Sequence, residues 1–345
     1  MRNPVTGSQL SARWLTSALA EQTGGARITS LDVDPMAGDD ALFSAPARLH
    51  VTWAGDPALP SSFVAKAVAS GDPASALGAS LGVFRREAAF YNELADRCGV
   101  RAPKAWFAWA ADDATLLILD DLVDQRAGDG RAGLSADDAS VVLEALATMH
   151  ARWWRDPSLA SLPWLARGDD AATVATDERV RTLLPVFVDR CGGGLGAVEL
   201  GLLAEVARSA SSWRLPLLDG PHRTLVHGDV KPGNLFFSGS APTFIDWQGV
   251  KVASPALDVA SLLGCGLLDA DTTVIAGLLA DYEACLAAVG VGLDREAWRD
   301  ELRLAAHAML IPCIAGAEVA ADDFVTTLAI TARRRISLAL SLREN

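Results

Sequence analysis

The chain has 345 residues, half of them hydrophobic, and a formal net charge of −13 at pH 7. This length can bury a large core and predicts two domains, whereas the acidic balance argues against nucleic acid and anionic membranes as partners. No apolar run reaches transmembrane length, and the five scattered cysteines lack the Cys-x-x-Cys spacing of zinc sites. We therefore expect a cytoplasmic, globular protein with reduced thiols.

The N-terminal part of the chain predicts a helix followed by strands. Residues 8–21 place their large apolar side chains on one side of a helix, which a glycine pair ends. Residues 28–33 and 48–53 alternate apolar and polar side chains, as strands do. A third strand, residues 62–68, carries Lys66 between apolar neighbours, where a lysine is costly to bury without a partner.

The middle of the chain changes from strand to helix. A helix predicted for about residues 74–98 precedes two strands, residues 103–109 and 115–119. Ser135 is a suitable N-cap for the next helix. Two further helices are expected within residues 171–213, and three or four beyond Asp258, up to Arg343.

The most informative stretch is residues 225–248, Leu-Val-His-Gly-Asp-Val-Lys-Pro-Gly-Asn-Leu-Phe-Phe, a Ser-Gly-Ser turn, and then Thr-Phe-Ile-Asp-Trp-Gln. Two short strands joined by a tight turn are predicted here. This hairpin would bring Asp229, Asn234 and Asp246 to one end. Carboxylate and amide oxygens are suitable ligands for the Mg²⁺ that a nucleotide carries.

This stretch resembles a known catalytic pattern. His227-Gly228-Asp229, with Asn234 five positions after the aspartate and Asp246 beyond it, is similar to the catalytic loop and metal-binding aspartate of the protein-kinase-like phosphotransferases. The glycine after the histidine and the Asp-Trp-Gln sequence resemble the small-molecule branch, which includes aminoglycoside phosphotransferases, choline kinases and ecdysteroid-kinase-like proteins.

The resemblance implies an architecture. We expect a two-lobed protein-kinase-like α+β fold, with a nucleotide-binding lobe at residues 1–119 and a catalytic and substrate-binding lobe at residues 120–345. The first lobe should hold a five-stranded antiparallel sheet and a helix, and the second should be mostly helical.

The resemblance also implies roles for the residues of the stretch. Asp229 corresponds to the catalytic base that orients the acceptor hydroxyl, and Asn234 and Asp246 to the Mg²⁺ ligands. Lys231 corresponds to a lysine near the transferred phosphoryl group, where a fixed cation stabilises developing charge; a solvated loop lysine is the alternative. His227 is interpreted as structural, tying the backbone of the loop.

By the same resemblance, ATP is the expected cofactor. The Val-Ala-Lys sequence at Lys66 resembles the strand that reaches the α- and β-phosphates. Glu87 resembles the helix glutamate that pairs with this lysine, and apolar neighbours at helical spacing place it near the buried face. Glu93 is the rival, and a surface carboxylate is the alternative for either. The backbone from Asp120 to Leu122 would meet the adenine edge.

Other residues match the family pattern in supporting positions. Asp258 resembles a buried aspartate that hydrogen-bonds the catalytic loop, and it also suits the N-terminus of a helix. His150 matches a helix motif of the superfamily, and packing in the core is favoured over catalysis. Residues 36–44 are an even choice between a loop over the phosphates and an ordinary turn. Three tryptophans could wall a substrate site, although core packing is favoured for each: Trp153, Trp154 and Trp164.

Two departures from the protein-kinase pattern disfavour a protein substrate. Gly228 replaces an arginine that reads a phosphorylated activation loop in many protein kinases. The segment between Asp246 and Asp258 is also too short for an activation loop and a peptide-docking platform.

The predicted function is ATP-dependent O-phosphorylation of a small molecule, such as an aminoglycoside or another antibiotic or natural product. One alternative is a metabolic hydroxyl kinase acting on choline, an amino sugar or a sterol. Another is a nucleotide-binding pseudokinase scaffold, which would be expected to lack one of the motif residues, yet all are present. The acidic composition slightly favours a cationic or neutral acceptor, although the field at the site need not follow the net charge.

Overall fold

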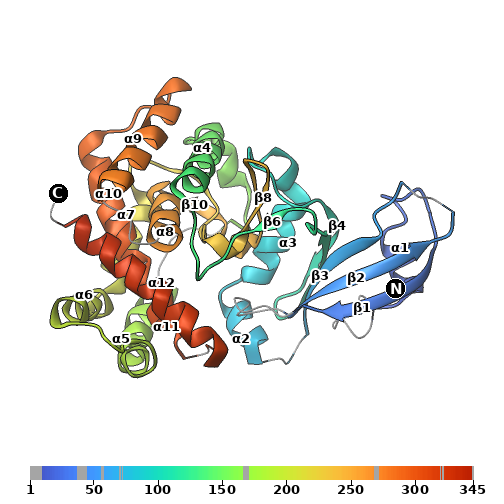
Figure 1. The fold of residues 1–345 in the computed structure, drawn as a ribbon, viewed down its shortest axis with the longest axis horizontal. Coiled ribbons are helices and arrows are strands. Elements are labelled where there is room, and N and C mark those ends of the chain that lie inside the picture. Colours follow the sequence, from blue (N-terminus) through green and yellow to red (C-terminus); the bar gives the residue numbers. More distant parts are fainter. Residues whose placement is uncertain are drawn as a thin grey trace. The chain divides into compact units, whose positions relative to one another are not determined.

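The computed structural model describes residues 10–36, 45–55, 58–69, 71, 73–165, 171–267, 272–318, 320 and 322–343. The chain divides into two compact units. Figure 1 shows the fold, coloured by position along the sequence. The first unit comprises Met1–Arg97, Arg101–Gln125 and Ile245–Gly249, and the second comprises Cys98–Val100, Arg126–Phe244 and Val250–Asn345. Asp246 therefore belongs to the first unit, although Asp229 and Asn234 belong to the second.

The first unit contains the five-stranded sheet that the sequence predicts, and all its pairings are antiparallel. The strand order is β1-β2-β3-β5-β4. The strands are β1 Ile28–Pro35, β2 Ala45–Trp53, β3 Ser62–Val68, β4 Ala105–Ala110 and β5 Thr115–Asp120. Since β3 is the central strand, Lys66 is held by neighbours on both sides, opposite Pro46 on β2 and Leu117 on β5.

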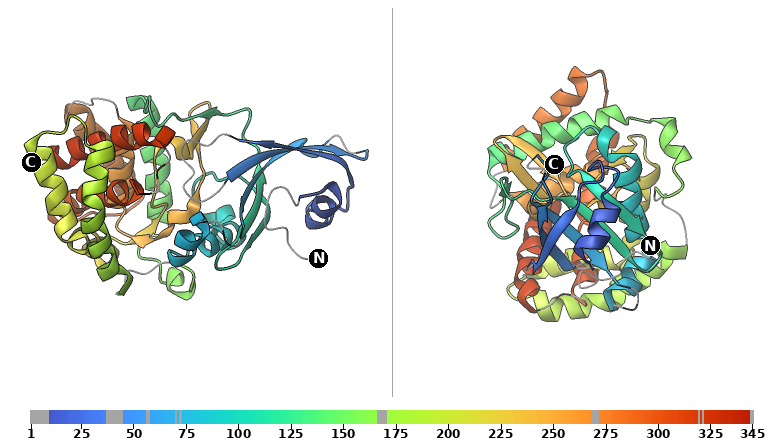
Figure 2. Two further views of the ribbon diagram at one scale, coloured as in Figure 1. Left: turned by 90° about the horizontal axis from the view of Figure 1, so that it is seen from below. Right: turned by 90° about the vertical axis from the view of Figure 1, so that its right-hand side faces the viewer.

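Helix α1, Ala12–Ala18, covers part of this sheet (Figure 2). Ser11 caps it by accepting a hydrogen bond from the Trp14 N–H at 3.2 Å, so the helix begins later than the predicted residue 8, which lies outside the described residues. Trp14 and Leu15 pack with Phe63 and Trp106 in one core cluster. Burial of these large side chains holds the helix on the sheet.

The prediction of one continuous helix over residues 74–98 is wrong. The structure has α2, Pro73–Ser80, then α3, Val83–Glu93, and a 3₁₀ turn, η2, at Ala95–Arg97. Gly82 separates the two α-helices because its φ of +64° is left-handed, a conformation that glycine adopts without steric cost.

The second unit is mostly helical, as predicted. Its α-helices are α4 Ala136–Arg152, α5 Ala171–Cys191, α6 Ala197–Arg208, α7 Ala210–Asp219, α8 Ala256–Gly266, α9 Thr272–Ala288, α10 Arg295–Ala308, α11 Leu310–Gly316 and α12 Asp322–Ser341. Helix α4 begins as predicted, with Ser135 Oγ accepting from the Asp138 N–H at 3.0 Å. Within the described residues, no helix of either unit combines the length and apolarity needed to cross a membrane.

The two helices predicted for residues 171–213 are present on either side of the glycine run after Cys191, as α5 and α6. A third helix, α7, begins at Ala210, after the chain leaves helical geometry at Ser209, where φ is −152°. Beyond α8, which contains Asp258, the described residues form four helices, α9 to α12, within the predicted three or four. One break lies between α10 and α11, where Pro312 cannot donate a backbone hydrogen bond to residue 308.

Short strands carry the predicted motif. A three-stranded sheet has the order β6-β8-β9, with β6 at Arg126–Ala127, β8 at Leu235–Ser238 and β9 at Ala241–Phe244. Strands β8 and β9 form the predicted hairpin, and Gly239 turns it with a φ of +60°. A further pair, β7 at Thr224–Val226 and β10 at Lys251–Ala253, flanks the motif on both sides in sequence.

Candidate active site

The loop from His227 to Asn234 connects β7 to β8, and one buried carboxylate holds its start. Asp258, in the first turn of α8, accepts hydrogen bonds from the backbone N–H groups of His227 and Gly228, each at 2.7 Å. Gly228 has a φ of +82°, which explains a glycine at this position. The expected bonding of Asp258 to this loop is confirmed, and so is its place at a helix N-terminus.

Asp229 lies in a cluster of polar groups from its own loop. Its carboxylate is 3.1 Å from Lys231 Nζ, and Asn234 Nδ2 donates to its side chain at 3.1 Å and to its carbonyl oxygen at 2.9 Å. Burial would raise the pKa of Asp229, but the charges of Lys231, Arg335 and His227 outweigh it and lower the pKa to about 2. This carboxylate is therefore ionised at neutral pH, and 37% of the side chain remains exposed.

His227 has the structural role that the sequence suggested. Its side chain is fully buried, and its Nδ1 accepts a hydrogen bond from the Asp229 N–H at 3.3 Å. The ring thus fixes the backbone next to the catalytic candidate.

His150 is packed in the core, as predicted, and it also joins a buried chain of polar groups. Its Nε2 lies 3.2 Å from Asp258 Oδ2, and its Nδ1 lies 2.8 Å from the Tyr282 hydroxyl. Burial raises the pKa of Asp258, but the hydrogen bond from His150 and the charges of His150 and His227 reverse this and lower it. Tyr282 comes from α9, so a distant helix supports the carboxylate that holds the loop.

Lys66 forms a three-charge cluster in the first unit. Its Nζ lies 2.9 Å from both carboxylate oxygens of Glu87 on α3 and 2.7 Å from Asp246 Oδ1. The predicted pairing with Glu87 is confirmed, and Glu93 is not the partner. Burial lowers the pKa of Lys66, but Asp246 and Glu87 outweigh it and raise the pKa, so the lysine is charged.

Asp246 is held in an unusual backbone conformation beside α3. Its φ is +63°, which is uncommon for a residue other than glycine and is often found at functional sites. The next residue, Trp247, stacks on Phe90 with ring centroids 3.9 Å apart, and Arg86 donates to the Gln248 carbonyl at 2.9 Å. These contacts secure the segment against α3.

The proposed adenine-contacting residues lie at the end of β5. The Asp120 carboxylate accepts hydrogen bonds from Trp106 Nε1 at 2.7 Å and from the Lys104 N–H at 3.2 Å, so its side chain serves to join β4 to β5. The Leu122 carbonyl accepts from the Gln125 N–H at 2.9 Å. Their contact with adenine stays a prediction, as does a phosphate-covering turn, because residues 37–44 lie outside the described residues.

Of the three tryptophans considered as pocket walls, Trp153 is a core residue. It is buried, and its Nε1 donates to the Cys98 carbonyl at 2.9 Å. Trp154 and Trp164 are only partly buried, and Trp154 contacts the ring of His222.

Asn234 in the second unit and Asp246 in the first each carry an oxygen atom of a kind that suits Mg²⁺. The Asn234 amide nitrogen is used by Asp229, which leaves the amide oxygen as its ligand atom. Asp246 supplies a carboxylate, and Mg²⁺ prefers oxygen ligands of both kinds. The donor chemistry therefore matches the nucleotide-borne metal that the sequence predicts.

The comparison with known sequence families decides the relationship. The sequence profile of the phosphotransferase enzyme family matches residues 71–299, which is more than half of the chain and includes every motif residue described above except Lys66. The chain belongs to the phosphotransferase enzyme family. No functionally curated protein matches this phosphotransferase in sequence.

Solved structures show the same fold. A choline kinase from Cryptosporidium parvum aligns with a TM-score of 0.56 at 10% identity, covering 91% of this chain and 89% of that one. A GDP complex of an aminoglycoside 2′-phosphotransferase aligns at 0.53 and 13% identity, covering 97% and 98%. An amicoumacin kinase with AMP-PNP and Ca²⁺ aligns at 0.52 and 13% identity, covering 90% and 88%. This phosphotransferase therefore has the two-lobed, protein-kinase-like α+β fold that its motifs indicated.

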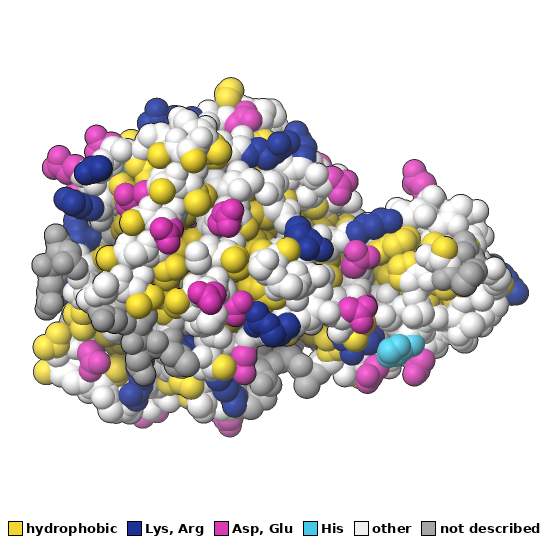
Figure 3. Space-filling model, turned by 45° about the horizontal axis from the view of Figure 1, so that its top comes forward, with side chains coloured by type: hydrophobic (Ala, Val, Ile, Leu, Met, Phe, Trp, Pro, Cys, Tyr) yellow, Lys and Arg dark blue, Asp and Glu magenta, His cyan; other side chains and the backbone are white. Residues whose placement is uncertain are grey.

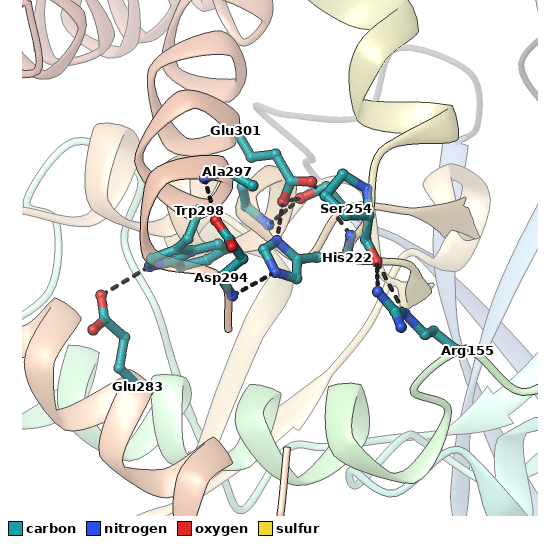
Figure 4. A network of polar contacts seen from close by, with 10 residues as sticks. Arg155, His222, Ser254, Glu283, Asp294, Ala297, Trp298 and Glu301 are labelled. Atoms are coloured by element: carbon teal, nitrogen blue, oxygen red, sulfur yellow. Dashed lines mark hydrogen bonds and ion pairs between the residues drawn. The ribbon is translucent and has the colours of Figure 1, made fainter. Parts of the chain in front are cut away.

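A second buried network joins α10 to the segment that precedes α8 (Figure 4). The Glu301 carboxylate on α10 lies 3.0 Å from His222 Nδ1 and accepts from Ser254 Oγ at 2.6 Å. His222 Nε2 accepts from the Asp294 N–H at 3.0 Å, so the proton of the neutral ring is on Nδ1 and is donated to Glu301. Ser254 Oγ also accepts from the Ala256 N–H at the start of α8, the helix that carries Asp258.

The sequence reading missed the members of these supporting networks. Tyr282, His222 and Glu301 are buried polar residues, yet each looks like an ordinary helix or loop residue in its local sequence. Arg335 was also missed. It is buried on α12 and its charge acts on Asp229, but only the packing of distant helices brings it there.

Proposed function

We propose that the protein transfers the γ-phosphoryl group of ATP to a hydroxyl group of a small molecule. The observation that carries this proposal is the arrangement at Asp229, an ionised carboxylate fixed by Asn234 and accompanied by Lys231, in a member of a phosphotransferase family. In the reaction a bond forms between the acceptor oxygen and the γ-phosphorus, and the bond from that phosphorus to the β–γ bridging oxygen breaks. ADP leaves, and Asp229 accepts the hydroxyl proton and passes it to solvent.

Asp229 acts mainly by position. A carboxylate with a pKa of about 2 is a weak base. It therefore accepts the proton of the acceptor hydroxyl group only as the hydroxyl oxygen loses electron density to phosphorus. Before that point it orients the hydroxyl group by accepting its hydrogen bond. Lys231 is the cation that stabilises the negative charge developing on the transferred phosphoryl group.

The cluster around Lys66 is proposed to hold the triphosphate. Lys66 binds the α- and β-phosphates while Glu87 fixes its ammonium group, and Asn234 and Asp246 are the proposed metal ligands. A metal held there would supply positive charge to offset that of the phosphates.

A small acceptor is favoured over a protein. The segment after Asp246 is short and ordered, with a 3₁₀ turn at Trp247–Gly249 and β10 following directly, and α8 begins at Ala256. This leaves no length for a peptide-docking activation segment. The names of the structural neighbours, a choline kinase, an aminoglycoside phosphotransferase and an amicoumacin kinase, support a small molecule as well.

The acceptor is proposed to be an aminoglycoside, another antibiotic or a natural product, with a metabolic alcohol such as choline, an amino sugar or a sterol as the alternative. A pseudokinase scaffold is disfavoured because Lys66, Asp229, Asn234 and Asp246 are all present. We also retain as proposals a cytoplasmic location and the lobe boundary between residues 119 and 120.

The test is acceptor-dependent ADP release from ATP and, in parallel, from GTP. The acceptors are aminoglycosides, nucleoside antibiotics, choline, amino sugars and sterols. Asp229→Asn should lower kcat by roughly 10²–10⁴-fold, the usual contribution of a positioned general base, and leave nucleotide binding unchanged. Asp300→Asn, at an exposed aspartate on α10, is the matched control and should keep wild-type turnover. Near-full turnover by Asp229→Asn would show that the base has been misassigned.

A further inference from the structure

A continuous chain of hydrogen bonds connects helix α9 to the catalytic loop within the second unit. The Tyr282 hydroxyl lies 2.8 Å from His150 Nδ1, and His150 Nε2 lies 3.2 Å from Asp258 Oδ2. That carboxylate oxygen accepts from the His227 N–H at 2.7 Å, and His227 Nδ1 accepts from the Asp229 N–H at 3.3 Å. The chain therefore runs from α9 to the backbone of the proposed base.

The α9 end of this chain lies in the interior. The side chains of Tyr282, His150 and Asp258 are each 0% exposed. Acidic and basic side chains are interspersed on the face drawn in Figure 3, and exposed ion pairs fix geometry only weakly. Buried polar groups must be paired, because an unpaired one costs the desolvation of that group. Removal of one member of the chain therefore leaves a neighbour without its partner.

The Tyr282 hydroxyl completes the pairing of the His150 ring. The ionised Asp258 carboxylate only accepts, so His150 Nε2 carries a proton and donates it. Burial raises the pKa of Tyr282, as do the charges of Asp258 and Glu283, so the hydroxyl keeps its proton. A hydroxyl donates to Nδ1 of a neutral ring and accepts from Nδ1 of a protonated one. It thus holds the ring with Nε2 toward Asp258 in either state.

His150 is also fixed through its backbone. Its carbonyl oxygen accepts from Thr224 Oγ1 at 2.7 Å, and Thr224 begins β7, the strand that leads into the catalytic loop. The residue therefore contacts β7 through its backbone and Asp258 on α8 through its ring. A change in ring orientation would act on both hydrogen bonds by which Asp258 holds the loop.

The packing of α9 fixes the direction of the tyrosine hydroxyl. Leu278, Tyr282 and Leu286 are buried and recur every four residues, so they share one face of a helix that packs on α4. The Tyr282 ring stacks on Trp298 with centroids 5.7 Å apart. Trp298 Nε1 in turn donates to Glu283 Oε1 at 2.8 Å, as Figure 4 shows. With its ring held on these sides, the hydroxyl is directed at the imidazole.

We propose that Tyr282 is a positioning residue for phosphoryl transfer, acting on Asp229 through this hydrogen-bonded chain. The inference rests on the proposed function for its effect on turnover, whereas its effect on the loop does not depend on that function. Tyr282 acts through other residues and narrows the range of positions that the loop adopts. Since the base acts mainly by position, a misplacement of about 1 Å can lower the rate by about 10²-fold.

The test is Tyr282→Phe, which removes one oxygen atom and keeps the ring. Its kcat should fall by roughly 10–100-fold, while KM for the acceptor and the affinity for ATP stay unchanged. Amide exchange at Gly228 and Asp229, followed by NMR, should accelerate. Leu286→Val is the matched control, because it removes one buried methylene group from the same face of α9 and keeps the hydroxyl. It should lower the melting temperature and leave kcat and both amides unchanged.

A measurement on the wild type covers the case in which Tyr282→Phe does not fold. If the chain acts as one unit, opening at one end frees the other. In ¹⁵N-labelled protein, the His150 Nε2–H and the loop amides of His227 and Gly228 should therefore exchange with a common temperature dependence. Independent exchange, or a His150 ring that is protonated on Nδ1 alone, would overturn the proposal.

Turnover and exchange separate the two hypotheses. Faster exchange in Tyr282→Phe, with no turnover of any acceptor by the wild type, would refute the proposed function alone. Wild-type turnover with an unchanged kcat or unchanged exchange in Tyr282→Phe would refute the role of Tyr282 alone. An equal fall of kcat in Leu286→Val would also refute that role, because α9 would then act only through general stability.

Discussion

Lys66 Nζ lies 2.7 Å from Asp246 Oδ1, so the proposed phosphate-binding cation and a proposed metal ligand form an ion pair. Glu87, which is 1% exposed, shares the same ammonium group. The cluster holds two carboxylates and one cation, so the positive charge of Lys66 is the one that offsets the two negative charges. Nucleotide with its metal would add both a cation for Asp246 and an anion for Lys66.

Lys66→Met should destabilise the protein by about 3–5 kcal/mol at neutral pH, the usual cost of breaking a buried ion pair from one side. Burial raises the pKa of Glu87, and losing Lys66 removes the group that opposes this rise. A carboxyl group whose pKa is raised in the folded state stabilises the fold at low pH, and this stabilisation is lost as the pH rises through that pKa. The free energy of unfolding of Lys66→Met, measured from pH 5 to 8, should therefore be lower than that of the wild type, and this difference should become smaller toward low pH. The double variant Lys66→Met, Glu87→Gln should lack this pH dependence. A loss of stability in Lys66→Met that stays constant with pH would contradict the account.

The pH profile of the wild-type enzyme tests the state of Asp229. Its pKa of about 2 is below the ordinary value, so the carboxylate stays ionised across pH 5–8, and kcat/KM should show no acid limb from this residue in that range. Lys231→Met removes one of the charges that oppose burial, so the pKa should rise and any acid limb should move upward. An acid limb near pH 6 in wild type that disappears in Asp229→Asn would refute this assignment.

Metal dependence follows from the donor chemistry. Turnover should require Mg²⁺ or Mn²⁺ and should stop on chelation, because the proposed ligands are amide and carboxylate oxygens. Asn234→Ala should raise the metal concentration needed for half-maximal rate and leave the fold intact by circular dichroism. Zinc should neither copurify nor restore activity. Full turnover after exhaustive chelation would exclude the proposed metal role.

Asp258 should matter for both stability and catalysis. Asp258→Asn places an amide donor against the backbone N–H of His227 or Gly228, so one buried donor loses its acceptor, at a cost of roughly 1–3 kcal/mol. The loop that carries Asp229 should become more mobile, and amide exchange at residues 227–229 should accelerate. Asp219→Asn, at an exposed aspartate on α7, is the control and should change neither quantity. Unchanged exchange in Asp258→Asn would show that the loop is held in another way.

Local patterns explain what the sequence predicted well. The hairpin of β8 and β9, the pairing of Lys66 with Glu87 and the bonds of Asp258 all follow from spacing in a short motif or from helical and strand periodicity. The left-handed Gly82 was misjudged, because a glycine inside an apolar helical pattern does not by itself reveal its φ.

Contacts between distant segments explain what was missed. Tyr282 lies 132 residues from His150, and Glu301 lies 79 residues from His222. These pairs exist because helices pack in one particular way, and their local sequences resemble those of surface residues. Arg335 belongs to the same class, since its thiol partners are 22 and 70 residues away.

The central claim is tested most directly by following the γ-phosphoryl group itself. The protein is incubated with γ-labelled ATP and Mg²⁺, with one panel of hydroxylated antibiotics and metabolites and another of peptides, and the products are separated and identified by mass. The account predicts that label enters a small molecule as a phosphate ester, that Asp229→Asn greatly reduces it, and that peptides remain unlabelled. Robust labelling of peptides with no labelled small molecule would contradict it.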